Sequence, residues 1–208
     1  MRYTLAILLN HHSTYKMTYI LVPNGDITLT LTTTKPPTKL LVSSHHLTNA
    51  SPYFKALLTG SFNEATDLDQ NGHVEIPLPD DDAEAMLIVM KAVHGVWRGI
   101  CPRLKLELLK NIAVVVDKYD LFDSVCTVLG TWVSTVRVGD RRARLQDVAV
   151  WFLCVAFVFN QGGAFQFATR EFVLDTGGDV DVRGTCIPVT IAGKLPPGVF
   201  TMDTMGEC

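Results

Sequence analysis

The sequence predicts an α+β fold: a small three-stranded sheet packed against a cluster of α-helices, followed by a C-terminal helical extension. Short segments in the first part of the chain alternate apolar and polar residues, which is the period of a half-buried strand. Other segments repeat apolar residues at helical spacing, as amphipathic helices do. Hydrophobic residues make up 48% of the 208 positions, which is enough to bury a core.

Three segments have the character of strands. Residues 26–31 alternate in polarity after an Asn24-Gly25 turn, and residues 40–42 form a second apolar run after a proline-rich break. The simplest connection between these two is a hairpin with a loop of several residues. Residues 74–78 alternate again and predict a third strand, which ends at Pro79.

Residues 43–58 change to a helical period but contain Ser51-Pro52. Proline is tolerated in the first turn of a helix and disfavoured inside one, so we infer two short helices, the second capped by Ser51. Phe54 falls on the face that should cover the sheet. Residues 60–72 are polar and acidic, and we expect them to form a loop.

The helices expected after the third strand are defined by apolar stripes. Asp80-Asp81-Asp82 is a helix start signal, and Asp81 with Glu84 three residues later suits a capping box. Gly95 should end this helix. The expected buried faces of this and the next two helices are Met86, Leu87, Met90 and Val93; Leu106, Leu109, Ile112, Ala113, Val116 and Tyr119; and Val125, Val128, Leu129, Trp132 and Val136.

The end of the chain is expected to form a separate extension. Residues 139–144 are the most plausible boundary, and an apolar helix at 148–159 follows them. A helix of this length spans about 18 Å, whereas a bilayer core is about 30 Å thick, so we expect it to be buried in protein. The apolar run at residues 5–9 is too short for a signal peptide. The sequence therefore predicts no membrane association.

Charge and cysteine usage narrow the class of protein. The net charge is −3 and the pI is near 6.0, so bulk electrostatics give no general attraction to nucleic acid. The five cysteines are odd in number and include no C-x-x-C pair, which favours reduced thiols in an intracellular compartment, cytoplasm or nucleus. Cys126 and Cys154 lie in apolar runs and are expected to be buried.

No pattern of catalytic, cofactor-binding or metal-binding residues is found. His45 and His46 are adjacent and have no partner ligand at suitable spacing, so a surface or cap role is the better interpretation. Motifs such as a P-loop, a nucleophile elbow or a Rossmann glycine pattern are missing. The three tryptophans are expected to fill the core, namely Trp97, Trp132 and Trp151. We therefore expect no enzyme activity, and the alternative of another class is an enzyme or metal-binding domain with a diffuse site.

Several segments together resemble a known family. DITL at 26–29 and VSSHHLTNASPYF at 42–54 resemble the opening of a BTB/POZ domain, whose signature ends in Leu-x-x-x-Ser-Pro-x-Phe. VEIPL at 74–78, the helix ending at His94-Gly95 and AVVVDKYD at 113–120 follow in the family's order. The chain looks like the fungal branch, in which a helical extension follows the domain. The resemblance thus implies an N-terminal segment at 1–18, a candidate disordered region, a BTB/POZ domain at 19–137 and an extension at 145–208.

The resemblance implies a protein-interaction module, an adaptor or scaffold with protein partners. Some members recruit the cullin scaffold of a ubiquitin ligase through a hydrophobic-x-Glu motif, which Phe62 and Glu64 match here. The alternative is that Phe62 packs back onto its own domain and Glu64 is solvated. Other members are homodimerising or transcription-associated proteins without cullin binding, and the candidate dimer-interface residues here are Asp26 and Leu47. Ala50 replaces the arginine that pairs with this aspartate in some dimers, which weakens the dimer expectation.

Overall fold

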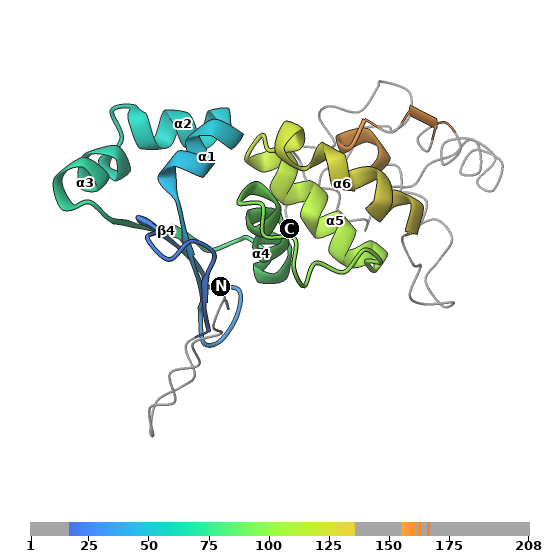
Figure 1. The fold of residues 1–208 in the computed structure, drawn as a ribbon, viewed down its shortest axis with the longest axis horizontal. Helices are drawn as coiled ribbons and strands as arrows, with labels where there is room; N and C mark the ends of the chain where they lie inside the picture. The colour runs from blue at the N-terminus through green and yellow to red at the C-terminus, as the bar shows by residue number, and fades with distance from the viewer. Residues whose placement is uncertain (1–16, 136–154, 161, 164–165, 167–208) are drawn as a thin grey trace, which may run out of the picture. The chain divides into compact units, whose positions relative to one another are not determined.

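A computed structural model describes residues 17–135, 155–160, 162–163 and 166, and the chain divides into two compact units, Met1–Arg98 and Gly99–Cys208 (Figure 1). The first unit contains a sheet and four helices. The described part of the second unit contains helices but no strand. The expected boundary at 139–144 and most of the expected extension lie outside the described residues. Within these residues, no helix is long and apolar enough to cross a membrane.

The sheet has four strands in the order β1-β3-β2-β4. The predicted hairpin is confirmed: β2 (Ile27–Leu31) and β3 (Thr38–Val42) pair antiparallel. The predicted third strand is β4 (Val74–Leu78), which pairs parallel to β2. The prediction of three strands was wrong, because β1 (Thr18–Ile20) pairs parallel to β3 at the other edge. A strand of three residues is too short to show alternation, and it places Thr18 in the sheet instead of the N-terminal segment.

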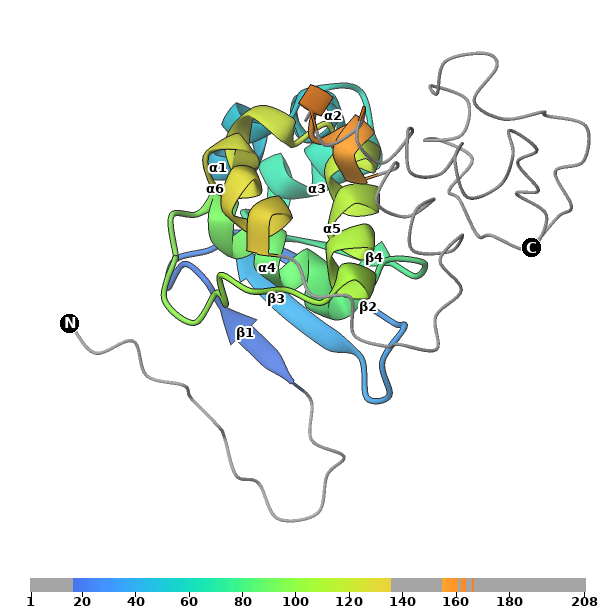
Figure 2. The same cartoon turned by 90° about the vertical axis from the view of Figure 1, so that its right-hand side faces the viewer.

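Alternation separates the two faces of this sheet. One face is packed into the core, and Figure 2 shows α4 (Ala83–Val93) lying over the sheet. The residues of the buried face are Ile27, Leu29, Leu31, Leu40, Val42, Val74, Ile76 and Leu78. Pro77 lacks an N–H donor and is tolerated because β4 is an edge strand.

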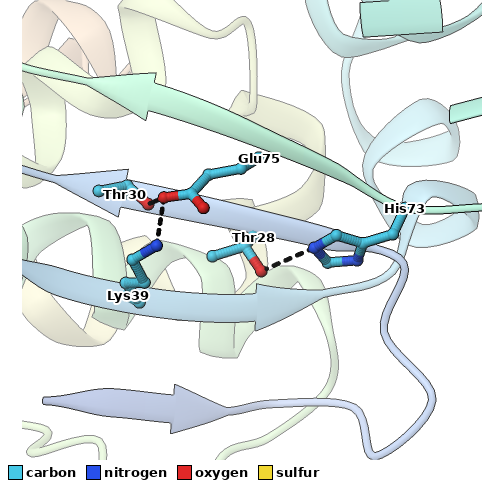
Figure 3. A network of polar contacts seen from close by, with 5 residues as sticks. All are labelled: Thr28, Thr30, Lys39, His73 and Glu75. Atoms are coloured by element: carbon cyan, nitrogen blue, oxygen red, sulfur yellow. Dashed lines mark hydrogen bonds and ion pairs between the residues drawn. The ribbon is translucent and has the colours of Figure 1, made fainter. Parts of the chain in front are cut away.

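The opposite face of the sheet is polar (Figure 3). The Glu75 carboxylate accepts a hydrogen bond from the Thr30 hydroxyl at 2.6 Å and forms an ion pair with the Lys39 ammonium group. Thr28 Oγ1 lies 3.2 Å from His73 Nε2. These cross-strand contacts bind β3, β2 and β4 together on the side away from the core.

The two helices predicted around Ser51-Pro52 are present as α1 (Ser44–Ala50) and α2 (Pro52–Thr59). The Ser51 hydroxyl oxygen accepts a hydrogen bond from the Phe54 backbone N–H at 3.1 Å, so the predicted cap is confirmed. Phe54 is 0% exposed, as its helical register required.

The expected loop at residues 60–72 instead contains a helix, α3 (Asn63–Asn71). Its polar composition concealed it, since none of its residues is buried and no apolar stripe exists to detect. The segment nevertheless has good helix formers and no proline. Gly72 ends the helix in the left-handed conformation with φ of 67°, which glycine adopts without strain.

Helix α4 begins one residue later than the expected capping box. Asp82, and not Asp81, is the N-cap, and its carboxylate accepts a hydrogen bond from the Ala85 N–H at 2.8 Å. Asp81 is buried, and its carbonyl oxygen accepts a hydrogen bond from the Thr33 hydroxyl. The buried face is also turned slightly, because Val89 is buried with Met86 and Met90 whereas Leu87 and Val93 are half-buried.

The second unit contains α5 (Leu106–Lys118), α6 (Phe122–Thr135) and a helical turn at residues 155–158. All six residues expected on the inner face of α5 and its end are buried. Val125, Leu129 and Trp132 are buried on α6. In the apolar run at 148–159, Val155 and Phe159 are buried, and residues 148–154 lie outside the described residues.

Two expected core residues are at the surface. Cys126 is exposed, because it follows the buried Val125 by about 100° around the helix. Trp97 is 45% exposed in the segment after α4, so only part of its ring is covered. Trp151 and Cys154 lie outside the described residues. Trp132, at 1% exposed, confirms the core expectation for one of the three tryptophans.

Candidate protein-binding surface

Phe62 is the most exposed aromatic residue among those that the structure describes in the first unit. It occupies the N-cap position of α3, and its side chain is 53% exposed. Its carbonyl oxygen accepts a hydrogen bond from the Thr66 N–H at 3.3 Å, which fixes the backbone. Packing of Phe62 against its own domain is therefore partial, and much of its ring is open to a partner.

Gly60 sets the path of the chain before Phe62. Its N–H donates to the Ala56 carbonyl oxygen at 2.9 Å as α2 ends. A Cβ atom at this position would lie 2.4 Å from that carbonyl oxygen and 3.4 Å from Phe62 Cδ2. The turn that presents the Phe62 ring thus requires a residue without a side chain.

Acidic groups follow Phe62 along α3. Glu64 lies half-buried in the first turn, where a carboxylate complements the positive end of the helix dipole. Asp67 and Asp69 are exposed further along, and the helix contains no lysine or arginine. This arrangement suits a partner that combines an apolar pocket for an aromatic ring with basic groups at its edge.

Tyr53 adds a second exposed aromatic ring on α2. It is 46% exposed, and its ring meets that of buried Phe54 edge-to-face at 5.4 Å between centroids. Ala56 lies three residues later, on the same face of the helix, and is also exposed. Sequence reasoning missed Tyr53 because one exposed aromatic residue beside a core residue leaves no periodic signal.

The two candidate dimer-interface residues lie elsewhere, at α1. The Asp26 carboxylate accepts hydrogen bonds from the Ser44 N–H at 2.7 Å and from the Ser44 hydroxyl. Asp26 thereby caps α1 from a distant part of its own chain. Its carboxylate has hydrogen-bond partners within the chain, although position 50 is alanine and not arginine. Leu47 is 0% exposed and packs inside the unit.

A group of histidines lies at the beginning of α1. His46 stacks on His94, with ring centroids 4.8 Å apart and an interplanar angle of 26°. His45 meets His46 edge-on at 6.3 Å. Sequence reasoning gave His45 and His46 a surface or cap role but missed His94, which is 48 residues from His46 in the chain. Among the described residues, no group of three or more histidine, cysteine or acidic side chains could hold a metal ion.

No protein-family model matches the chain, and no curated protein matches it either. Neither comparison therefore adds evidence about the candidate surface.

Proposed function

We propose that this chain is a non-enzymatic protein-interaction module, an adaptor or scaffold of the BTB/POZ type. The observation that carries the proposal is the exposed Phe62 ring followed by Glu64 in the first turn of α3. The order of elements also supports the proposal, since the β2–β3 hairpin leads into the short helices α1 and α2, and β4 and α4 follow after α3.

The proposed partner is the cullin scaffold of a ubiquitin ligase, in an intracellular compartment. Phe62 would fill an apolar pocket on the cullin, and Glu64 would pair with a basic group beside it. Phe62 is exposed, and α3, which contains Glu64, buries none of its residues. Surface substitutions usually change the free energy of unfolding by less than about 0.5 kcal/mol, so the two positions can be altered without unfolding the chain.

The test is binding of the purified full chain to a cullin N-terminal domain by calorimetry. Phe62→Ala combined with Glu64→Lys should abolish binding and leave the melting temperature nearly unchanged. Asp69→Lys is the matched control, because it makes the same charge change on an exposed residue of α3 and should retain binding. The charge reversal at Glu64 should slow association more at low salt than at high salt.

Two outcomes would contradict the adaptor proposal. If the unaltered chain binds no cullin, the remaining proposal within this class is a homodimerising or transcription-associated scaffold, which light scattering would reveal as a dimer. If the double variant unfolds, the Phe62 ring contributes to the core and is not a contact residue.

Stabilisation of the chain by a divalent metal in thermal melting would instead favour a metal-dependent domain.

A further inference from the structure

His94 joins the end of one helix to the beginning of another. It is the C-cap of α4, and its Nδ1–H donates to the Met90 carbonyl oxygen at 2.8 Å. Its Nε2 accepts a hydrogen bond from the Ser43 backbone N–H at 3.1 Å. A carbonyl oxygen only accepts and an amide N–H only donates, so both bonds require the neutral ring with its hydrogen on Nδ1.

Helix α1 depends on acceptors supplied by remote residues. It has seven residues, and its N-cap Ser43 makes no side-chain cap hydrogen bond. So short a helix is marginal by itself, and the N–H groups at its start need partners. His94 accepts from the Ser43 N–H, and Asp26 accepts from the Ser44 N–H.

We propose that His94 is an acid-sensitive latch, which holds the start of α1 to the end of α4 while its ring is neutral and releases it when Nε2 is protonated. A proton on Nε2 would set two N–H donors against each other and leave the Ser43 amide without an acceptor. The neighbouring His46 ring, stacked with its centroid 4.8 Å away, also disfavours a positive charge on His94.

The charged groups around the latch are few. His46 faces His94 from α1, and His45 meets His46 edge-on. The Asp26 carboxylate lies beside Ser44, where it accepts two hydrogen bonds at the start of α1. Lys91 is in the last turn of α4. No carboxylate forms an ion pair with His94 in the described part of the chain, so no counter-charge compensates for protonation of the ring.

Burial, the largest cause, lowers the pKa of His94 from its ordinary value of 6.5. The hydrogen bond to the Met90 carbonyl oxygen raises it, and the neighbouring His46 lowers it. The Ser43 amide belongs with the causes that favour the neutral ring, because it donates to the lone pair that a proton would occupy. The His94 ring therefore binds a proton more weakly while the Ser43–His94 hydrogen bond is formed than after it is broken. The latch is fully effective above the ordinary pKa and weakens as the pH falls below it.

The size of the effect follows from linkage of one proton. Between the ordinary pKa and the lowered pKa, opening should become more favourable by about tenfold for each pH unit. Hydrogen exchange of α1 peptides in the full chain measures this opening at about pH 7.5, 6.5 and 5.5. Comparison with His94→Gln at the same pH cancels the intrinsic pH dependence of exchange. This variant retains a donor and an acceptor but does not titrate.

We expect the protection of α1 in the unaltered chain to fall relative to His94→Gln as the pH is lowered. His45→Gln is the matched control, because it removes a neighbouring exposed histidine that is not stacked on His94, and it should behave as the unaltered chain does. An unchanged ratio between the unaltered chain and His94→Gln would overturn the proposal. So would ring nitrogen spectra that place the hydrogen of His94 on Nε2 at neutral pH.

If His94→Gln does not fold, His46→Gln provides the second test. It leaves the latch residue in place and removes the opposing charge, so the titration of the His94 ring followed by NMR should move to higher pH. A midpoint that stays where it was, or moves to lower pH, would count against the latch.

Discussion

Phe54 shows how one side chain connects α2 to the core. It is fully buried, and the Ser51 cap fixes the start of its helix. We expect Phe54→Ala to lower the free energy of unfolding by about 3–5 kcal/mol, because it removes a buried aromatic ring and leaves a cavity.

Urea unfolding measures this effect, and loss of soluble protein would also agree with it. Tyr53→Ala is the control, since it removes a neighbouring ring that is 46% exposed and should have a much smaller effect. Soluble Phe54→Ala protein with unaltered stability would show that the ring is not a core anchor.

Asp26 stabilises α1 through hydrogen bonds to Ser44. Hydrogen bonds to a charged group are worth about 1.5–3 kcal/mol, so Asp26→Ala should lower the free energy of unfolding by an amount of this order. Combining it with Ser44→Ala should give less than the sum of the two effects, since both remove the same hydroxyl–carboxylate contact.

The control for this cycle is Asp80→Ala, which removes an exposed carboxylate near the start of α4. It should change stability by less than about 0.5 kcal/mol. Strict additivity of the Asp26 and Ser44 substitutions would mean that the two side chains do not interact in solution.

At the scale of elements, β1 is the first strand that the structure describes, and it shows which N-terminal residues take part in the sheet. The strand begins at Thr18, and the Met17 carbonyl oxygen accepts a hydrogen bond from the Lys39 N–H at 2.8 Å. The amino-acid sequence of residues 1–16 has no periodicity of a strand or helix. We expect deletion of residues 1–16 to leave the melting temperature nearly unchanged.

Differential scanning calorimetry of the shortened chain checks this expectation. Because about 1 kcal/mol moves the melting temperature by roughly 2–4 °C in a chain of this size, a loss of several degrees would be clear. Such a loss would mean that residues 1–16 pack on the fold. A chain that begins at Leu21 is the comparison, since it also lacks β1 and should be less stable.

Periodic burial made most elements predictable. β2 and β4 alternate apolar and polar residues in the sequence, β3 contains an apolar run, and α5 repeats its buried residues at helical spacing, so local pattern was sufficient. α3 was missed because it buries no residue, and β1 because it has three residues.

At the scale of the whole molecule, the missed features are contacts between segments far apart in the chain. Local periodicity contains no information about the Ser43–His94 bond, which joins residues 51 positions apart, or the Asp26–Ser44 bond, which spans 18. Phe62 and Glu64 were identified through a resemblance and not through physics. The exposure of Phe62, the half-burial of Glu64 and the close approach of Gly60 to the Ala56 carbonyl oxygen are set by the folded structure.

The crowding at Gly60 has a consequence for genetic screens of this protein. Gly60 is not among the proposed contact residues, and its φ of −86° is open to any residue, so its backbone angles would not single it out. A Cβ atom would nevertheless lie 2.4 Å from the Ala56 carbonyl oxygen, so any side chain would shift the turn that leads to Phe62. In a library selected for binding, this glycine would score like a contact residue. A map of intolerant positions would therefore extend beyond the footprint of the partner.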